Sequence, residues 1–148
     1  MPETRRERII QALLGRAATI TIAKGFSTDI GASTLRAVVK VDPTLLPACV
    51  VFPSVETAER IGGGEVFCTM PVTIEGVAMV GVTGNASVLS ELILGDIRSA
   101  FFGSSITDLI DELSYVSGGS SSYASKDAVT VTVKILVRYY SKISDPFY

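Results

Sequence analysis

The sequence predicts an α+β domain in which two main amphipathic helices pack on one face of a mostly antiparallel sheet. Three observations lead to this fold class. Two separate segments repeat apolar residues every three or four positions, which is the period of a helix. Other stretches alternate apolar and polar residues with the period of two that is typical of strands. The chain has 148 residues, and domains most often hold roughly 100–150, so we expect residues 1–148 to form a single domain.

The first helix is predicted to begin after Thr4, because Thr4 and Glu7 have the spacing of a capping box. Its apolar side chains form one stripe, which consists of Ile9, Ile10, Leu13, Leu14, Ala17 and Ile20. A turn is expected over Lys24–Gly31, where Gly25 and Gly31 can adopt positive φ.

Strands are predicted to follow over Thr34–Val41, Ala48–Val55 and Glu65–Val80. The second of these is nearly all apolar, which suits the interior of a sheet. Pro71 cannot donate to a ladder, so we expect a sheet edge or a bulge at that position. Gly62–Gly64 is expected to be a flexible hinge or a loop tip.

The second helix is predicted to be capped by Asn85 or Ser87 and to end at Gly103, where a left-handed residue is favoured. Its expected apolar face consists of Val88, Leu89, Leu92, Ile93, Ala100 and Phe101. Gly95 lies inside this helix at a cost of about 1 kcal/mol relative to alanine, so we expect close packing there.

The C-terminal part is predicted to hold two more strands, over Asp108–Val116 and Ala128–Tyr140. The serine- and glycine-rich segment between them, Ser117–Ser125, is typical of a mobile loop. In the last strand, alternate residues from Val129 to Tyr139 form an apolar face, and the opposite face is polar to mixed.

The composition excludes several classes of function. The chain has no histidine, which removes the imidazole bases of many enzymes and most zinc sites. Its 13 basic and 15 acidic residues give a net charge of −2, which argues against a nucleic-acid binder that neutralises phosphates in bulk. Cys49 and Cys68 lie apart in apolar runs, so we expect buried, unreactive thiols and a reducing, cytoplasmic place of synthesis.

The mean hydropathy of +0.44 is high for a small soluble monomer. A membrane span does not explain it, because the longest stretch without formal charge, Gly76–Ser90, is shorter than the about 20 residues that a span needs. A signal peptide is not expected either, since Met1–Arg8 carries charges of both signs. We therefore expect apolar surface that other copies of the chain cover.

No catalytic or cofactor motif stands out. Asp108, Asp111 and Glu112 cluster, but no ligand-rich segment accompanies them, so a solvated turn or strand is the simpler interpretation. Gly62–Gly64 lacks the sequence context of a phosphate-binding loop. We predict no enzyme activity, no metal and no cofactor.

Several segments of the chain resemble the tail terminator, or tail completion, proteins of long-tailed bacteriophages. The similarity runs nearly end to end and includes the opening RRERIIQALLGRAATI, the turn KGFSTDIG and a strand that ends in VTIEGV. The most telling pattern is LxxLILxDIRxA, here within LSELILGDIRSAFFG, followed by a long valine strand that ends in RYY and DPF.

The resemblance implies a structural role. Such proteins form a ring, usually a hexamer, on the head-proximal end of the finished tail tube, where they stop the addition of tube subunits and contact neck or head-completion proteins. It therefore implies three partners, namely other copies of the chain, the major tail tube protein and a neck or head-completion protein. The implied location is the virion, after assembly in the host cytoplasm. Candidate docking loops are Lys24–Gly31, Val55–Glu65 and Ser117–Lys126.

Five residues are candidates for a subunit or ring-docking interface, namely Arg36, Lys40, Arg138, Phe147 and Tyr148. The first three are charges within otherwise apolar strands, which can face a neighbouring subunit, the ring lumen or water. The last two form an apolar tail, which can bind an adjacent protomer or fray.

Other interpretations stay open. A neck or head-completion protein, or a tube subunit, belongs to the same class of assembly protein. From a different class, a small-molecule or regulatory binding module of ferredoxin-like build would need a closed apolar pocket with a few convergent polar groups. An enzyme of a new type has only the carboxylate cluster in its favour.

Overall fold

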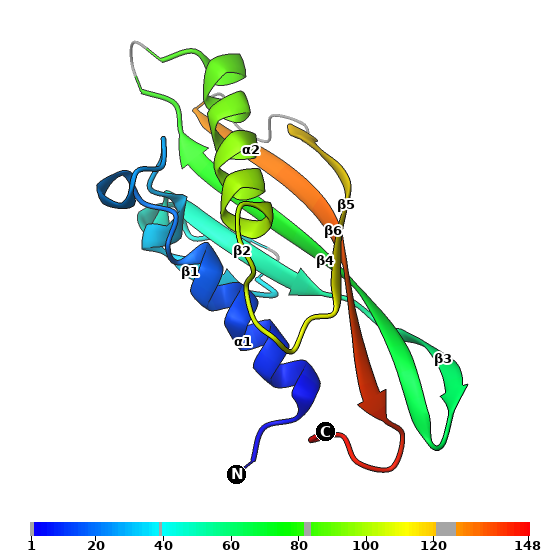
Figure 1. The fold of residues 1–148 in the computed structure, drawn as a ribbon. Coiled ribbons are helices and arrows are strands. Elements are labelled where there is room, and N and C mark those ends of the chain that lie inside the picture. The colour runs from blue at the N-terminus through cyan, green and yellow to red at the C-terminus, as the bar shows by residue number, and fades with distance from the viewer. Residues whose placement is uncertain (1, 39, 82–83, 121–126) are drawn as a thin grey trace.

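The fold has two layers, a β-sheet and a layer of α-helices (Figure 1). The computed structural model describes residues 2–38, 40–81, 84–120 and 127–148. The α-helices and strands are α1 (Arg5–Ala17), β1 (Thr34–Arg36), β2 (Ala48–Pro53), β3 (Thr57–Gly62), β4 (Glu65–Met79), α2 (Ala86–Phe102), β5 (Glu112–Ser120) and β6 (Ala128–Lys142).

The described strands form one sheet in the order β1-β2-β4-β6-β5. Strand β6 occupies one side of β4 along the whole length of β4. Strands β2 and β3 therefore both pair with the other side of β4. All pairs among these strands are antiparallel except β1 with β2, which is parallel. Both α-helices cover the same face of the sheet (Figure 1). The predicted α+β class, with two helices on one face of a mostly antiparallel sheet, is therefore confirmed.

Helix α1 begins and packs as predicted. The Thr4 side chain accepts a hydrogen bond of 3.0 Å from the backbone N–H of Glu7, which caps the first turn. The predicted stripe faces the core, where Ile9, Ile10, Leu13, Ala17 and Ile20 are buried. The Glu7 carboxylate accepts hydrogen bonds from the side chains of Gln11 and Arg36.

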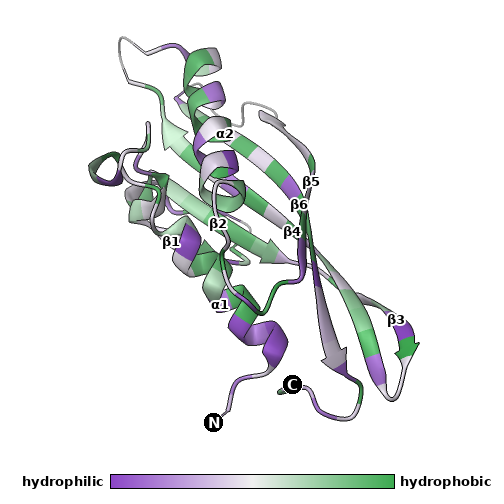
Figure 2. Cartoon of the chain, in the orientation of Figure 1, coloured by the Kyte–Doolittle hydropathy of each residue, from purple (hydrophilic) through white to green (hydrophobic). Residues whose placement is uncertain are grey.

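The long strands β4 and β6 supply most of the sheet's contribution to the core. Their side chains alternate strictly between buried and more exposed, as the sequence predicts, and Figure 2 shows this alternation as bands of hydropathy along both strands. In the register, Met70 lies opposite Val137 and Ile74 opposite Val133, so their apolar faces coincide under the helices.

Helix α2 packs directly onto β4 at Gly76. A Cβ at this glycine would lie 2.5 Å from Ile93 Cγ2 and 3.0 Å from Ile30 Cδ1. Such distances are shorter than any ordinary contact, so only glycine allows the helix to approach the sheet this closely.

The predicted strand over residues 34–41 is wrong beyond Arg36. The strand ends there because Ala37 has a φ of 53°, in the left-handed region, which turns the backbone away from β2. Lys40 consequently lies exposed in the connection between β1 and β2.

The predicted edge or bulge at Pro71 also needs correction, because β4 is an interior strand of the sheet. At Pro71 the ladder on one side passes from β2 to β3, and the Pro71 carbonyl accepts from Ser54, which lies between these two strands. In a strand the N and O of one residue point to the same side. The missing proline donor therefore faces this break in the ladder.

The loop predicted over residues 117–125 is wrong in its first part. Residues 117–120 belong to β5, and Gly118 and Gly119 lie opposite Val133 and Thr132 of β6. The long β6 strand provides ladder partners, and these outweigh the loop-like composition of the segment. Residues 121–126 lie outside the described residues.

The end of α2 also differs from the prediction. Gly103 has a right-handed φ of −74°, and its N–H donates to the Ser99 carbonyl at 2.9 Å. Arg16 of α1 donates to the carbonyls of Ala100 at 2.9 Å and Ser105 at 2.7 Å. An arginine side chain from the other helix therefore takes part in satisfying the carbonyls at this end.

Candidate functional site

Arg36, at the end of β1, is engaged within the chain. Its Nη1 atom lies 2.6 Å from Glu7 Oε1 on α1. The hydrogen-bonded guanidinium holds the pKa of Glu7 below its ordinary value. Both side chains are partly exposed, so the pair ties β1 to α1 at the surface.

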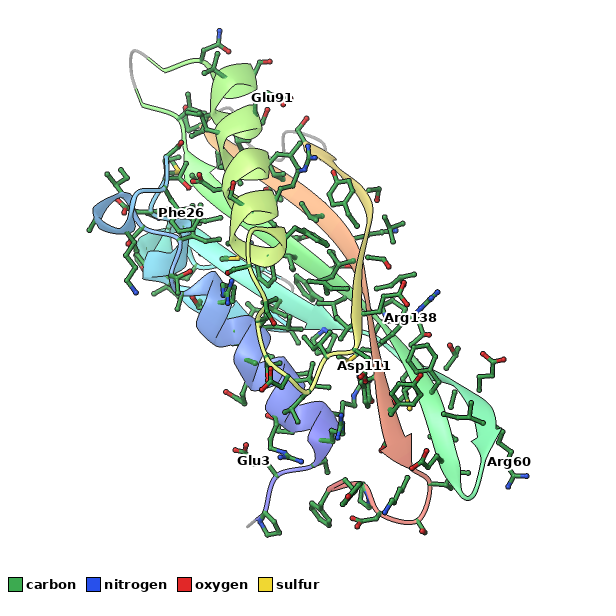
Figure 3. All side chains as sticks on the ribbon, in the orientation of Figure 1. Glu3, Phe26, Arg60, Glu91, Asp111 and Arg138 are labelled. Atoms are coloured by element: carbon green, nitrogen blue, oxygen red, sulfur yellow. The ribbon has the colours of Figure 1, made fainter. Side chains whose placement is uncertain are left out.

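Arg138 lies on the sheet face opposite the helices, beside the start of β5 (Figure 3). Its Nη1 atom lies 3.3 Å from Glu112 Oε2 of β5. Strands β2 and β4 separate β6 from β1, so the structure does not bring Arg138 and Arg36 together. Lys40 is exposed in the β1–β2 connection and does not belong to a strand face.

The C-terminal tail folds back against the start of α1. The Pro146 carbonyl accepts from Arg5 N at 2.8 Å, and the Phe147 carbonyl accepts from Arg8 Nη2 at 2.6 Å. Lys142 Nζ lies 3.8 Å from the centre of the Tyr148 ring. The rings of Phe147 and Tyr148 stay exposed, so the chain holds the backbone of the tail and presents its apolar side chains outward.

The sheet has apolar side chains at free edges on its two sides. All six residues of β3 are exposed, including Ile61, and Val55 just before this strand is 83% exposed. On the other side, β5 is the last strand of the described sheet and exposes Tyr115 and Val116. The ladder with β6 is irregular between Tyr115 and Ser117.

A second apolar surface, which was not predicted from the sequence, lies along the outer side of α2. We define the α2 outer stripe as Val88, Glu91, Leu92, Gly95, Arg98, Ser99 and Phe102, all exposed in the described chain. Val88 is 56% exposed and Leu92 41%, so their predicted place on the core face is wrong. The core face of α2 instead holds Ser90 and Asp96 besides its apolar residues.

The buried Asp96 explains why this side of α2, and not the side with Val88 and Leu92, faces the core. Its Oδ1 accepts from the backbone N–H of Ser27 at 3.0 Å, and its Oδ2 accepts from the backbone N–H and the hydroxyl of Thr28 at 2.8 and 2.6 Å. Three donors thus satisfy a carboxylate that is 5% exposed. The contact anchors the turn before β1 to α2. Sequence periodicity offers no signal for it, because both partners are polar.

The end of the α2 outer stripe meets β5. The rings of Phe102 and Tyr115 are in edge-to-face contact, with centroids 5.9 Å apart. The Arg98 guanidinium carbon lies 5.1 Å from the centre of the Tyr115 ring. Together with Gly95 and Ser99 they line a surface hollow of about 560 Å³.

A cavity of about 580 Å³ lies between the start of α1, the β3–β4 hairpin and the C-terminal tail. In it the Tyr139 hydroxyl donates to the Glu56 carboxylate, and burial and this partner raise the pKa of Tyr139. Burial likewise raises the pKa of the Cys68 thiol to about 11, so this thiol stays protonated near neutral pH. Arg60 also lines the cavity, and its side chain extends away from the hairpin (Figure 3).

Two members of the carboxylate cluster, Asp111 and Glu112, bind residues of β6 at the start of β5. Asp111 Oδ2 accepts from Tyr140 N at 3.0 Å, and Glu112 pairs with Arg138. In the described part of the chain, no three His, Cys, Asp or Glu side chains are grouped to hold a metal ion. None of the helices described is long and apolar enough to span a membrane.

No family model matches the chain, and no curated protein matches it in sequence.

Proposed function

We propose that this chain is a structural subunit of a bacteriophage tail, which forms a ring at the head-proximal end of the tail tube. The ring ends tube polymerisation and joins the tail to the neck or head. The proposal comes from the sequence resemblance. The structural observation that supports it is that two edge strands of the described sheet, β3 and β5, lie on its opposite sides.

Free edges suit a ring because they carry unpaired backbone groups that another strand can complete. In a cyclic assembly, each subunit uses one surface toward one neighbour and a different surface toward the other. Edge β5 of one copy and edge β3 of the next meet this requirement. The exposed Val116 on β5 and Ile61 on β3 supply apolar area for such a contact.

The proposal is tested by size-exclusion chromatography with light scattering, followed by negative-stain imaging with purified tail tubes. We expect the wild-type chain to form rings that cap tubes. Val116→Asp and Ile61→Asp place a charge on each edge and are expected to abolish ring formation. Ile22→Asp alters an equally exposed apolar residue away from both edges, and we expect this control to form rings as the wild type does.

Two outcomes would contradict the proposal. One is a wild-type chain that stays below ring size at high concentration and leaves tube ends uncapped. The other is ring formation that both edge variants leave unchanged. A neck or head-completion protein of the same class would form rings without limiting tube length, so the length of tubes assembled with and without the chain separates these roles.

A second candidate function, a small ligand-binding module, draws on the cavity beneath the hairpin. Its volume of about 580 Å³ lies within the range of roughly 300–1,000 Å³ for ligand pockets. The Tyr139–Glu56 pair offers polar groups beside the apolar Val66 and Ile143. This function predicts a chain that never forms rings and whose NMR signals at Tyr139 and Cys68 shift saturably with a small-molecule fragment.

A further inference from the structure

The α2 outer stripe contains a helix glycine that nothing within the chain requires. A Cβ at Gly95 would meet no atom within 4 Å, and the residue is exposed in the middle of α2. Glycine in a helix interior costs about 1 kcal/mol relative to alanine. A Cβ at Gly15 in α1 would also meet no atom within 4 Å. The residues four positions before and after Gly15, Gln11 and Thr19, are polar, whereas Gly95 lies between exposed apolar residues.

Exposed apolar side chains lie before and after Gly95 along the stripe. The exposed apolar side chains of Val88 and Leu92 lie on one side of Gly95 and Phe102 on the other. Two hollows flank the glycine, one of about 560 Å³ that reaches Tyr115 and one of about 360 Å³ that reaches Phe26. A helix apolar on both its inner and its outer side normally has a partner on each.

We propose that the α2 outer stripe binds the same stripe of a second copy, antiparallel and around a two-fold axis at Gly95. In that arrangement, residues equally far before and after Gly95 face each other, because a two-fold contact is self-complementary. The facing pairs are Val88 with Phe102, Leu92 with Arg98 and Glu91 with Ser99 of the second copy. The first pair is apolar, and in the second the aliphatic stem of Arg98 packs on Leu92.

The charges of the stripe select a second copy of this chain as the occupant. Glu91, on the outer side of α2 (Figure 3), comes within side-chain reach of Arg98 of the second copy. The two Glu91 residues lie about 12 Å apart along the axis at 1.5 Å per residue. Among the described residues, neither Glu91 nor Arg98 forms an ion pair within its own chain. The contact therefore supplies each with an opposite charge, and Gly95 lets the helix backbones approach closely.

The stripe meets strand β5 at Tyr115, but it does not include the β3 edge, and the dimer contact does not depend on the proposed ring. Covering the stripe in pairs would reduce the apolar surface of free subunits, which fits the high mean hydropathy of the chain. We expect the dimer to persist in the Ile61→Asp variant, which removes the proposed ring contact on β3, away from the stripe. The failure of one proposal is thus distinguishable from the failure of the other.

The first test compares two glycine substitutions by analytical ultracentrifugation in the Ile61→Asp background. Gly95→Ala is expected to raise the dimer dissociation constant at least about tenfold, equivalent to ~1.4 kcal/mol. Gly15→Ala is the matched control and is expected to leave the dissociation constant unchanged. Both substitutions should raise the melting temperature of the monomer, because alanine reduces the conformational freedom of the unfolded chain relative to glycine. An equal effect of the two on dimerisation would overturn the proposal.

The second test is a charge exchange between copies. In the same Ile61→Asp background, Glu91→Arg alone and Arg98→Glu alone are each expected to be monomeric, because like charges then meet across the axis. Mixed in equal amounts, the two variants are expected to form a heterodimer in which both contacts pair opposite charges. An Ile61→Asp chain that stays monomeric at its highest soluble concentration, or a mixture that fails to associate, would refute the contact. Binding of the stripe only to a foreign protein would refute it as well.

Discussion

Replacing Asp96 by asparagine tests how the turn before β1 is held to α2. The carboxylate uses both oxygens, one for Ser27 N and one for Thr28 N and Oγ1. An asparagine of the same shape keeps one acceptor and turns an NH₂ group toward the remaining donor. We therefore expect at least one donor in this buried contact to lose its partner, and the others to lose a charged acceptor.

The magnitude follows from burial. An unsatisfied buried polar group costs about 1–3 kcal/mol, and hydrogen bonds to charged groups contribute about 1.5–3 kcal/mol. Since Asp96 is 5% exposed, water cannot readily replace the lost partner. Asp96→Asn is thus expected to lower the free energy of unfolding by about 2–4 kcal/mol, without loss of side-chain volume.

Urea unfolding followed by circular dichroism measures this change, and hydrogen exchange at Ser27 and Thr28 locates it. Asp42→Asn is the matched control, because Asp42 also accepts from a backbone N–H and a hydroxyl, both of Thr44, but at an exposed site. We expect no measurable change for this control. Equal unfolding free energies for the two variants, with exchange at Ser27 and Thr28 unaltered, would show that the buried carboxylate does not stabilise the contact.

Two further predictions concern the sheet face and the surface ion pair. Gly76→Ala places a Cβ 2.5 Å from Ile93 Cγ2, and we expect it to lower the free energy of unfolding by about 1–3 kcal/mol. Gly119→Ala is the control, because its Cβ meets nothing within 4 Å, and we expect it to leave the free energy of unfolding unchanged. Equal effects of the two substitutions in urea unfolding would contradict the packing argument. Because Arg36 lowers the pKa of Glu7 from 4.5 in the folded state, the pair stabilises the fold above that pH and loses this contribution as the pH falls through the lowered pKa. The difference in unfolding free energy between wild type and Arg36→Gln should therefore shrink below about pH 4.5, and a difference independent of pH from 3 to 7 would count against the ion pair.

Local features of the sequence determined the helix starts and the long strands. Thr4 and Asn85 cap their helices through contacts with the next few residues, so their roles depend on short-range geometry. The alternation along β4 and β6 likewise has a period that the backbone imposes. The short β1 and the strand character of residues 117–120 depended on Ala37 and on β6, which supply constraints that local composition does not contain.

The candidate surfaces depended on tertiary structure to a greater degree. Of the five residues proposed from the sequence, Arg36 and Arg138 have partners within the chain, and two intervening strands separate β1 from β6. The outer stripe of α2 could not be predicted, because this helix is apolar on two sides and its period alone does not say which side faces the sheet. Asp96 decides that, by accepting hydrogen bonds from Ser27 and Thr28, residues far away in the chain. The sequence by itself therefore determined the elements and the α+β class, whereas the choice of buried side came from a long-range polar contact that only the folded chain forms.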